Sequence, residues 1–392
     1  MSPTLFFLVT SLIKMIVVFT VIMVGVAFMT LIERRLCAFM QDRLGPNRVG
    51  PFGLLQPAAD GLKNIVKEET YPATADLWTF VLAPAVALTP ALLTFAVIPF
   101  GTPLPTKWGP VPFVVADLPV GFLYILAIGS LGVYGIVLAG WSSNNKYALL
   151  GGLRASAQLI SYEIAMGMST VAVLLLAGNV SLTDVVARQQ GSVFQWNVFP
   201  LLLAYVIFII AAFAETNRVP FDLPEAEGEL VAGYHAEYSA MKFSMFYIAE
   251  YSNMVTASAL MTTLFFGGYD IPFTHWDDTG DPTVLKTLAT AAMFFVKVFS
   301  FLFLYIWVRW TLPRFRYDQL MALGWKVMLP LALLYLTVVA TAIWYLHAVL
   351  GWAYDMRFSL VMFAMNLVLA VPVFLVLDRG HLIAGSVQRR SA

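Results

Sequence analysis

Long apolar stretches recur along this chain of 392 residues and constrain its fold more than any other feature. A helix of about 20 apolar residues crosses the hydrocarbon core of a bilayer, where the backbone must satisfy its own polar groups. The candidate spans are 5–32, 78–99, 117–140, 158–178, 199–214, 243–267, 287–308, 328–350 and 358–377. We therefore predict an all-α polytopic membrane protein with about nine transmembrane helices, the fifth of them short.

The distribution of Lys and Arg predicts the orientation of these helices. If the N-terminus lies outside, seventeen of the 23 basic residues fall in inner segments. The outer segments hold only four, which are Lys107, Arg188, Lys286 and Arg357. Because positively charged loops are retained on the inner side, we expect the N-terminus outside and the C-terminus inside.

The composition argues against several classes of function. Only 12% of the residues are charged, against about 25% in soluble domains. The 23 basic and 23 acidic residues balance, so a nucleic-acid binder is not expected. The single Cys37 excludes a disulfide framework and an iron–sulfur cluster built by this chain alone. The four His residues show no metal-binding spacing, so we expect no metal site.

The first inner loop combines a stiff turn with an amphipathic segment. Its sequence "QDRLGPNRVGP" (41–51) contains two Gly and two Pro residues within 45–51, which favours a turn over a helix. Apolar residues then recur at helical spacing from Leu54 to Val66, with Asp60 and Lys63 on the opposite face. This pattern predicts a short amphipathic helix on the inner membrane surface or beneath a partner.

A second inner loop, residues 215–239, concentrates acidic residues. It contains one arginine, Arg218, and six carboxylates: Glu215, Asp222, Glu225, Glu227, Glu229 and Glu237. A run of charges is usually a solvated face. Here Pro220 and Pro224 constrain the backbone, and aromatic and apolar residues alternate with the acids. That mixture favours a buried polar cavity over a disordered acidic segment.

Besides Lys14, which we expect to snorkel from the first span to the outer surface as a structural residue, three charged residues fall well inside predicted spans. Glu163 lies about one and a half turns inside the fourth span and Glu250 about two turns inside the sixth, while Lys297 lies deep in the seventh. Charges in hydrocarbon cost about 2.5–3.5 kcal/mol each, so they are candidates for function, such as a proton relay. The alternative is that each Glu pairs with a basic residue of a neighbouring helix as a structural contact.

Several segments together resemble one known family. They are "LIERRLCAFMQDRLGPNRVGPFGLLQPAADGLK", "ALLGGLRASAQLISYE", "AETNRVPFDLPEAEGELVAGYHAEYS", "FYIAEYSNM" and "LPRFRYDQLM". They resemble the H-subunit family (mitochondrial subunit 1) of respiratory complex I, the proton-pumping NADH:quinone oxidoreductase. The resemblance implies a domain of eight transmembrane helices over 1–350, and it likens 351–392 to the additional C-terminal helix and tail of some bacterial members.

This resemblance implies a role in quinone reduction. Family members anchor the peripheral arm of the complex, line the quinone chamber and couple quinone reduction to proton pumping. The implied chamber residues are Glu33, Arg34, Arg48, Asp60 and Lys63. The implied coupling residues are Arg154, Glu163, Glu215, Arg218, Asp222, Glu225, Glu227, Glu229, Glu250 and Lys297. His235 is not expected to be essential.

The resemblance also implies ligands, partners and location. Ubiquinone or menaquinone would bind as a substrate, and this chain would hold no flavin, iron–sulfur cluster or metal. NADH, FMN and the clusters would belong to partner subunits. Expected partners are the B, D and I subunits of the peripheral arm, the A, J and K subunits of the membrane arm, and lipid of the bacterial inner (plasma) membrane.

Three alternatives stay open at this point. The chain could be the corresponding ion-handling subunit of a membrane-bound hydrogenase, a paralogue that uses no quinone. It could be a stand-alone secondary transporter or channel, which intramembrane Glu and Lys would also serve. It could also be a passive anchor in which every charge is a packing contact, which only mutagenesis distinguishes from a coupling role.

Overall fold

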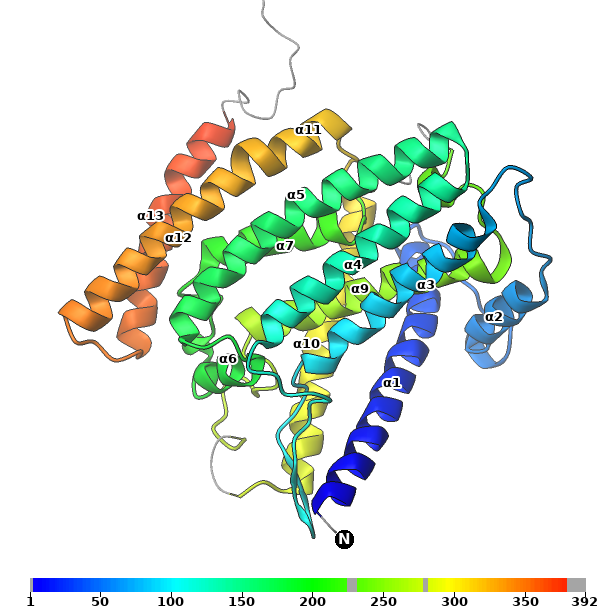
Figure 1. The fold of residues 1–392 in the computed structure, drawn as a ribbon. Helices are drawn as coiled ribbons and strands as arrows, with labels where there is room; N and C mark the ends of the chain where they lie inside the picture. The colour runs from blue at the N-terminus through cyan, green and yellow to red at the C-terminus, as the bar shows by residue number, and fades with distance from the viewer. Residues whose placement is uncertain (1–2, 224–230, 278–280, 379–392) are drawn as a thin grey trace, which may run out of the picture.

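The chain forms a bundle of long tilted helices with one small β-ribbon (Figure 1). In a computed structural model of the full chain, residues 3–223, 231–277 and 281–378 are described. The helices are α1 (Pro3–Met40), α2 (Gln56–Val66), α3 (Leu77–Leu93), α4 (Gly121–Ser142), α5 (Lys146–Ala177), α6 (Leu182–Gln189), α7 (Leu202–Glu215), α9 (Ala240–Phe265), α10 (Val284–Thr311), α11 (Tyr317–Ala322), α12 (Leu329–Ile343) and α13 (Met356–Asp378).

Shorter elements join or extend these helices. The 3-10 turns are η1 (Pro51–Gly53), η2 (Thr94–Val97), η3 (Val193–Gln195) and η4 (Gly233–His235), and the π-helical turns are η5 (Leu323–Met328) and η6 (Trp344–Val349). Strands β1 (Leu104–Thr106) and β2 (Gly109–Val111) pair antiparallel between α3 and α4. The sequence analysis did not predict this ribbon, because its Gly- and Pro-rich segment shows no alternating pattern of apolar residues.

Each of the nine predicted spans contains a helix. Among the described residues, seven helices are long and apolar enough to cross a membrane: 4–40, 77–97, 121–142, 146–177, 284–311, 317–349 and 356–375. Helix α7 has 14 residues and is short, as predicted, and α9 is not among the seven. An all-α polytopic membrane architecture is therefore confirmed, while the number of nine crossings and the orientation stay predictions.

Helix α9 lies at the centre of the bundle, against α1, α2, α3, α6, α7 and α10. It is less apolar than the neighbouring helices α1, α3, α7 and α10, because hydroxyl side chains lie along it. These hydroxyls bond to the helix backbone: Ser258 Oγ donates to the Met254 carbonyl (2.8 Å) and Thr262 Oγ1 to the Ser258 carbonyl (3.0 Å). Satisfied in this way, small polar residues allow close helix packing without leaving unpaired groups in the interior.

Helix α5 begins earlier than the sequence analysis predicted. The Asn145 side chain caps it by accepting from the Tyr147 amide (2.9 Å), so the helix starts at Lys146 rather than near residue 158. Its first turns contain two glycines that resemble a loop in sequence. A Cβ on Gly151 would lie 2.6 Å from the Gly233 Cα, so glycine is required there by close packing. Glu163 consequently lies in the middle of this helix.

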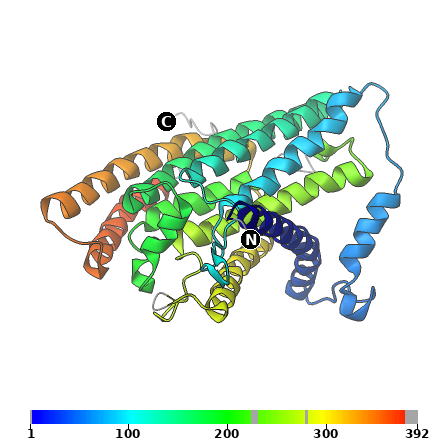
Figure 2. The same ribbon diagram turned by 60° about the horizontal axis from the view of Figure 1, so that its bottom comes forward.

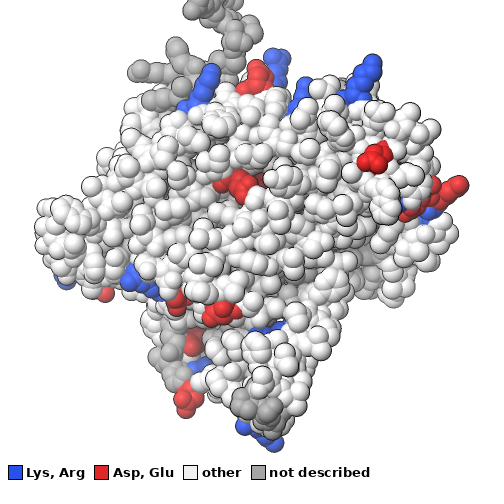
Figure 3. Space-filling view, in the orientation of Figure 1, with Lys and Arg blue, Asp and Glu red and all other residues white. Residues whose placement is uncertain are grey.

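The views show how the charged ends and apolar middle are arranged. Helices α1 and α10 run steeply, whereas α3, α4, α5 and α12 run diagonally across the bundle (Figure 1). Helices α12 and α13 lie side by side at one edge (Figures 1 and 2). Most Lys, Arg, Asp and Glu side chains lie above or below a broad uncharged band (Figure 3). The predicted amphipathic helix is α2, which buries none of its residues.

Candidate functional site

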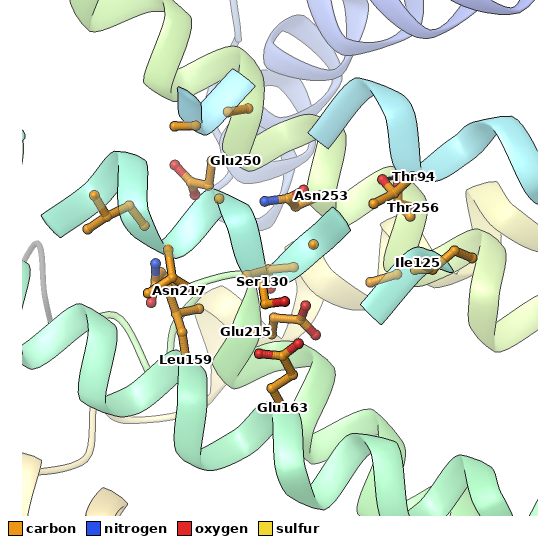
Figure 4. A pocket seen from close by; sticks show the side chains of 18 of the residues that line it. Thr94, Ile125, Ser130, Leu159, Glu163, Glu215, Asn217, Glu250, Asn253 and Thr256 are labelled. Atoms are coloured by element: carbon orange, nitrogen blue, oxygen red, sulfur yellow. Dashed lines mark hydrogen bonds between the residues drawn. The ribbon is translucent and has the colours of Figure 1, made fainter. Parts of the chain in front are cut away.

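A cavity of about 80 Å³ in the middle of the bundle brings together three of the predicted carboxylates. Glu163 reaches it from α5, Glu215 from the end of α7 and Glu250 from α9 (Figure 4). Its other polar lining residues are Thr94, Ser130, Thr216, Asn217, Tyr234, Asn253 and Thr256. Among the described residues, no Lys or Arg lines this cavity. It is therefore a mainly apolar space with an acidic cluster, lined by α3, α4, α5, α7 and α9 and by the turns η2 and η4.

Glu163 and Glu215 form the most closely associated pair of acids in the cavity. Their carboxylates point toward one another (Figure 4), and Ser130 of α4 lies beside them. In the described part of the chain, neither carboxylate forms an ion pair with a Lys or Arg. Of the two intramembrane Glu residues for which a structural ion pair was the alternative, Glu163 therefore has no such pair among the described residues, whereas Glu250 pairs with Arg218.

Glu250, by contrast, belongs to a continuous ion-pair network. Its Oε1 lies 2.7 Å from Nε of Arg218, whose side chain is only 5% exposed. Arg218 also donates from Nη1 to Glu33 Oε1 (3.3 Å), and Glu33 accepts from the Tyr251 hydroxyl and pairs with Arg309. Two carboxylates and two guanidinium groups thus alternate from the cavity to the end of α1 and balance in charge.

The backbone that presents Arg218 is held by a single buried amide. After α7 the chain turns back, and the Arg218 amide donates to the Phe213 carbonyl (3.3 Å). Gln158 of α5, fully buried, donates from Nε2 to the carbonyls of Ala214 (2.8 Å) and Phe221 (2.9 Å). Gln158 Nε2 also donates to Asn217 Oδ1 (3.2 Å). Two backbone carbonyls and one side chain of this turn are therefore fixed to α5, because buried polar groups need a partner.

The next part of the acidic loop lies at the end of α10. Asp222 Oδ2 accepts from Nη2 of Arg314 (3.1 Å). Burial raises the pKa of the Asp222 carboxyl, and the nearby positive charge of Arg314 opposes this rise. The predicted coupling residues Glu225, Glu227 and Glu229 lie outside the described residues.

Two larger cavities flank the C-terminal part of α1. One of about 420 Å³ lies between α1, α2 and α9, and it is lined mainly by apolar atoms together with Arg34, Asp60 and Lys63. The other, of about 310 Å³, is lined by Glu33, Arg34, Cys37, Arg43, Arg309 and aromatic residues. Both cavities reach Thr30, Arg34, Tyr247 and Tyr251, so they adjoin one another.

The predicted chamber residues divide between these cavities. Arg34 Nη1 lies 2.7 Å from Asp60 Oδ2, and Lys63 Nζ lies 3.6 Å from Asp60 Oδ1. The first contact joins α1 to the polar face of α2, and the second lies within α2. Glu33 turns the other way, toward Arg218 and the second cavity. Arg48 is exposed and lines neither of the two cavities.

Two predicted coupling residues lie away from the carboxylate cavity. Arg154 is half-buried, with its guanidinium 5.2 Å from the centre of the Tyr317 ring. Lys297 lies at the far end of α9, where its ammonium donates to the backbone carbonyls of Phe266, Gly268 and Asp270. Neither residue lines the carboxylate cavity.

The sequence analysis missed several residues that complete the site: Ser130, Gln158, Tyr251, Asn253, Arg309 and Arg314. The two arginines had a detectable signal, because a buried Glu33 requires a cation and "VRWTLPRFR" places both next to the end of an apolar span. The hydroxyl and amide residues had none, since they are common in membrane helices. In the described ranges, no group of three or more His, Cys, Asp or Glu residues could hold a metal ion.

Comparison with known proteins identifies the family. A family model described as NADH dehydrogenase matches residues 13–340. The chain is 51% identical over 328 residues to the NADH-quinone oxidoreductase H subunit of Leptospira biflexa, covering 81% of this chain and 90% of that protein. The chain belongs to this family. It is also 52% identical over 321 residues to the second NADH-quinone oxidoreductase H subunit of Geobacter sulfurreducens, covering 82% of this chain and 92% of the relative.

A third relative of the same family is the second NADH-quinone oxidoreductase H subunit of Koribacter versatilis, 49% identical over 352 residues, covering 87% of this chain and 98% of that protein. The carboxylate cavity and the Glu33 network lie entirely within the residues that match the family model. Helix α13 begins at Met356 and lies beyond the match, which ends at residue 340.

Proposed function

We propose that this chain is the membrane-arm subunit of a bacterial NADH-quinone oxidoreductase that lines the quinone chamber and couples quinone reduction to proton pumping. The names of its relatives support the identity of the complex. The observation that carries the coupling role is the ion-pair network from Glu33 through Arg218 to Glu250, which connects two cavities with a buried acidic one.

The two cavities beside α1 fit the two halves of a quinone. The larger one is mostly apolar and is rimmed by Arg34, Asp60 and Lys63 at its polar face, which suits an apolar tail. The smaller one presents Tyr251, Arg309 and Glu33, which suits a head group with two carbonyl oxygens. Ligand sites commonly combine an apolar lining with a few polar groups that fix orientation.

Coupling follows from the charge balance of the network. Reduction of a quinone consumes two electrons and two protons, so charge changes in the chamber next to Glu33. Arg218 holds both Glu33 and Glu250, and a change that draws it toward one carboxylate weakens its hold on the other. Groups linked so closely titrate together rather than singly. Glu163 and Glu215 then offer a buried place where a proton can be taken up or released.

Electrons must reach the quinone from other subunits, because this chain has one cysteine and no motif for a flavin or cluster. We assign NADH, FMN and iron–sulfur clusters to partner subunits, with the B, D and I subunits on the peripheral side and the A, J and K subunits in the membrane. In this arrangement the nine helices cross the bacterial inner membrane with the N-terminus outside, so that α2 and the acidic loop face the peripheral arm.

The test is Glu250→Gln in the assembled complex, compared with Asp184→Asn, which changes an exposed acid on α6. We expect inhibitor-sensitive NADH:quinone reduction and proton pumping to fall about tenfold or more in Glu250→Gln, the scale of a lost proton-transfer group. Oxidation of NADH by an artificial acceptor should stay normal in both variants. Full quinone reduction with full pumping in Glu250→Gln would refute the coupling role.

A further inference from the structure

Helix α13 packs on the bundle with apolar residues such as Phe358 and Met362, and one buried amide adds polar contacts. The helix lies outside the residues that match the family model, so the family assigns it no role. The residue Asn366 of α13 is only 1% exposed, and it lies where α13 meets α7 and α12. A buried side-chain amide in an apolar helix is costly unless its hydrogen bonds are made.

Asn366 makes every hydrogen bond that its amide offers. Its Nδ2 donates to the carbonyls of Pro200 (2.9 Å) and Met362 (2.7 Å). Its Oδ1 accepts from the Leu203 amide (3.1 Å) and from the Tyr335 hydroxyl (2.8 Å). An Asn side chain has two donor hydrogens and two acceptor lone pairs, so all four are used. The contact is therefore specific in geometry and not merely apolar packing.

Asn366 contacts the start of α7, where no capping side chain accepts hydrogen bonds from the first backbone amides. Helix α7 has 14 residues, about 21 Å in length, and irregular backbone precedes it. The first amides of any helix lack partners within the helix. Leu201, at the N-cap position, has no side chain that could accept a hydrogen bond. Asn366 of α13 supplies an acceptor for the Leu203 amide in the first turn of α7. A neighbouring helix can in this way satisfy backbone groups where a membrane helix is interrupted.

The segment before α13 contacts the end of a second helix. Arg188 of α6 donates to the Leu176 carbonyl in the last turn of α5, a position where a cation is favourable. Its guanidinium lies 4.5 Å from the centre of the Tyr354 ring. Tyr354 therefore packs on the arginine that binds the last turn of α5. The two helices supported in this way, α5 and α7, are those that bring Glu163 and Glu215 into the cavity.

We propose that residues 351–366 support the ends of α5 and α7, and that Asn366 is a positioning residue for Glu215. Leu203 and Glu215 lie on one helix, about 18 Å apart along its axis. A helix shifts as a unit, so release of its first turn changes the position of its last. The effect of the position of Glu215 on coupling rests on the proposed function. The capping of α7 by Asn366 does not rest on it.

The cap is tested by hydrogen–deuterium exchange in the assembled complex. The variants are Asn366→Leu, which branches at Cγ as Asn does but is larger and makes no hydrogen bonds, and Asn366→Asp, which keeps both acceptor bonds. The matched control is Val368→Ala, which shortens an exposed side chain of the same helix. We expect the amides of residues 202–205 to exchange about tenfold faster in Asn366→Leu, the factor for one lost hydrogen bond. Asn366→Asp should lie between Asn366→Leu and the wild type, and the control should match the wild type.

The positioning role is tested by the pH dependence of inhibitor-sensitive quinone reduction in the same variants. We expect the profile of Asn366→Leu to shift by about half a pH unit, since a small change in the surroundings of a buried acid suffices for that. Unchanged exchange at 202–205 would overturn the cap. Faster exchange with an unchanged profile would overturn the positioning role.

A replacement variant and a readout that is independent of Glu250 complete the test. If Asn366→Leu fails to assemble, Asn366→Ser replaces it, because the shorter side chain stays polar but no longer reaches the Leu203 amide, and the same criteria apply. The exchange measurement does not involve Glu250. If Glu250→Gln refutes the coupling role, exchange at 202–205 therefore still decides whether α13 caps α7.

Discussion

Two sites place charge inside the apolar bundle, and they treat it in opposite ways. At the end of α9, Lys297 donates to three backbone carbonyls, those of Phe266 (2.7 Å), Gly268 (3.0 Å) and Asp270 (2.6 Å). In the central cavity, Glu163 and Glu215 face each other (Figure 4) without an ion pair to any described Lys or Arg.

Hydrogen-bond acceptors and an aromatic ring surround the ammonium group of Lys297. The carbonyls it binds follow the last turn of α9, where the helix dipole is negative. The ammonium also lies 4.3 Å from the centre of the Trp196 ring, and the indole Nε1 donates to Asp270 (2.7 Å). All three ammonium hydrogens therefore have acceptors. These contacts favour a structural role, in which Lys297 closes α9, over the predicted role in proton transfer.

The difference shows that depth in the membrane does not by itself identify a coupling residue. Insertion cost marks Lys297, Glu163 and Glu250 alike. What distinguishes them is whether fixed partners compensate the charge. A charge whose partners are fixed stabilises the fold, whereas carboxylates without fixed partners can change protonation when charge changes nearby. Glu250 lies between these two cases, because its partner Arg218 is shared with Glu33.

The largest effect is expected for Lys297→Leu. The substitution leaves three buried carbonyls without their donor. It should lower the free energy of unfolding by about 3 kcal/mol or more, at about 1–3 kcal/mol for each carbonyl left unsatisfied. The amount of complex on a native gel should fall, and artificial-acceptor activity should fall in parallel. Lys107→Leu, at an exposed site, is the control. Normal assembly with lost pumping would return Lys297 to the coupling residues.

A large effect of a different kind is expected for Glu163→Gln and Glu215→Gln. Assembly and artificial-acceptor activity should stay normal, while quinone-linked proton pumping falls about tenfold or more. Because the two carboxylates face each other, the double variant should lose no more than the worse single variant, which a double-mutant cycle measures. Additive losses would show that the two acids act independently and would break the contrast with Lys297.

A smaller effect is expected for His235, a third kind of buried group that is held neutral. Burial lowers the pKa of His235 to about 4, whereas the unfolded chain binds this proton near pH 6.5. Between about pH 6.5 and 4 the unfolded state thus holds more protons, so stability falls as the pH falls. The midpoint temperature of thermal dissociation should be lower at pH 5.5 than at pH 7.5. In His235→Gln the difference between the two midpoint temperatures should be smaller. Equal drops in both proteins would contradict this expectation, and exposed His275→Gln is the control.

The smallest effect is expected for Arg48→Ala. Its side chain is exposed and lines neither cavity beside α1, so the KM for quinone should change by less than about threefold, the scale of an exposed charge. Arg34→Ala, which removes the contact with Asp60 at the cavity, is the comparison and should raise the KM more. A larger effect at Arg48 would restore its predicted place in the quinone chamber.

Local composition and periodicity account for several features of the fold without reference to any distant contact. Apolar length specifies the helical membrane architecture, including the short α7. Helical spacing predicts α2, and the Gly–Pro segment 41–51 predicts the non-helical turn. Each of these follows from neighbours within a few residues, because hydrophobic burial and backbone hydrogen bonding act along the segment itself.

Which charges meet depends instead on contacts between distant segments. Glu33 and Arg218 are 185 residues apart, and Asn366 and Leu203 are 163 apart. No local pattern distinguishes Lys297, with three carbonyl acceptors, from Glu215, which faces another carboxylate. The partner of a buried polar group is set by how tilted helices cross, and those crossings depend on close packing such as that of Gly151 against Gly233.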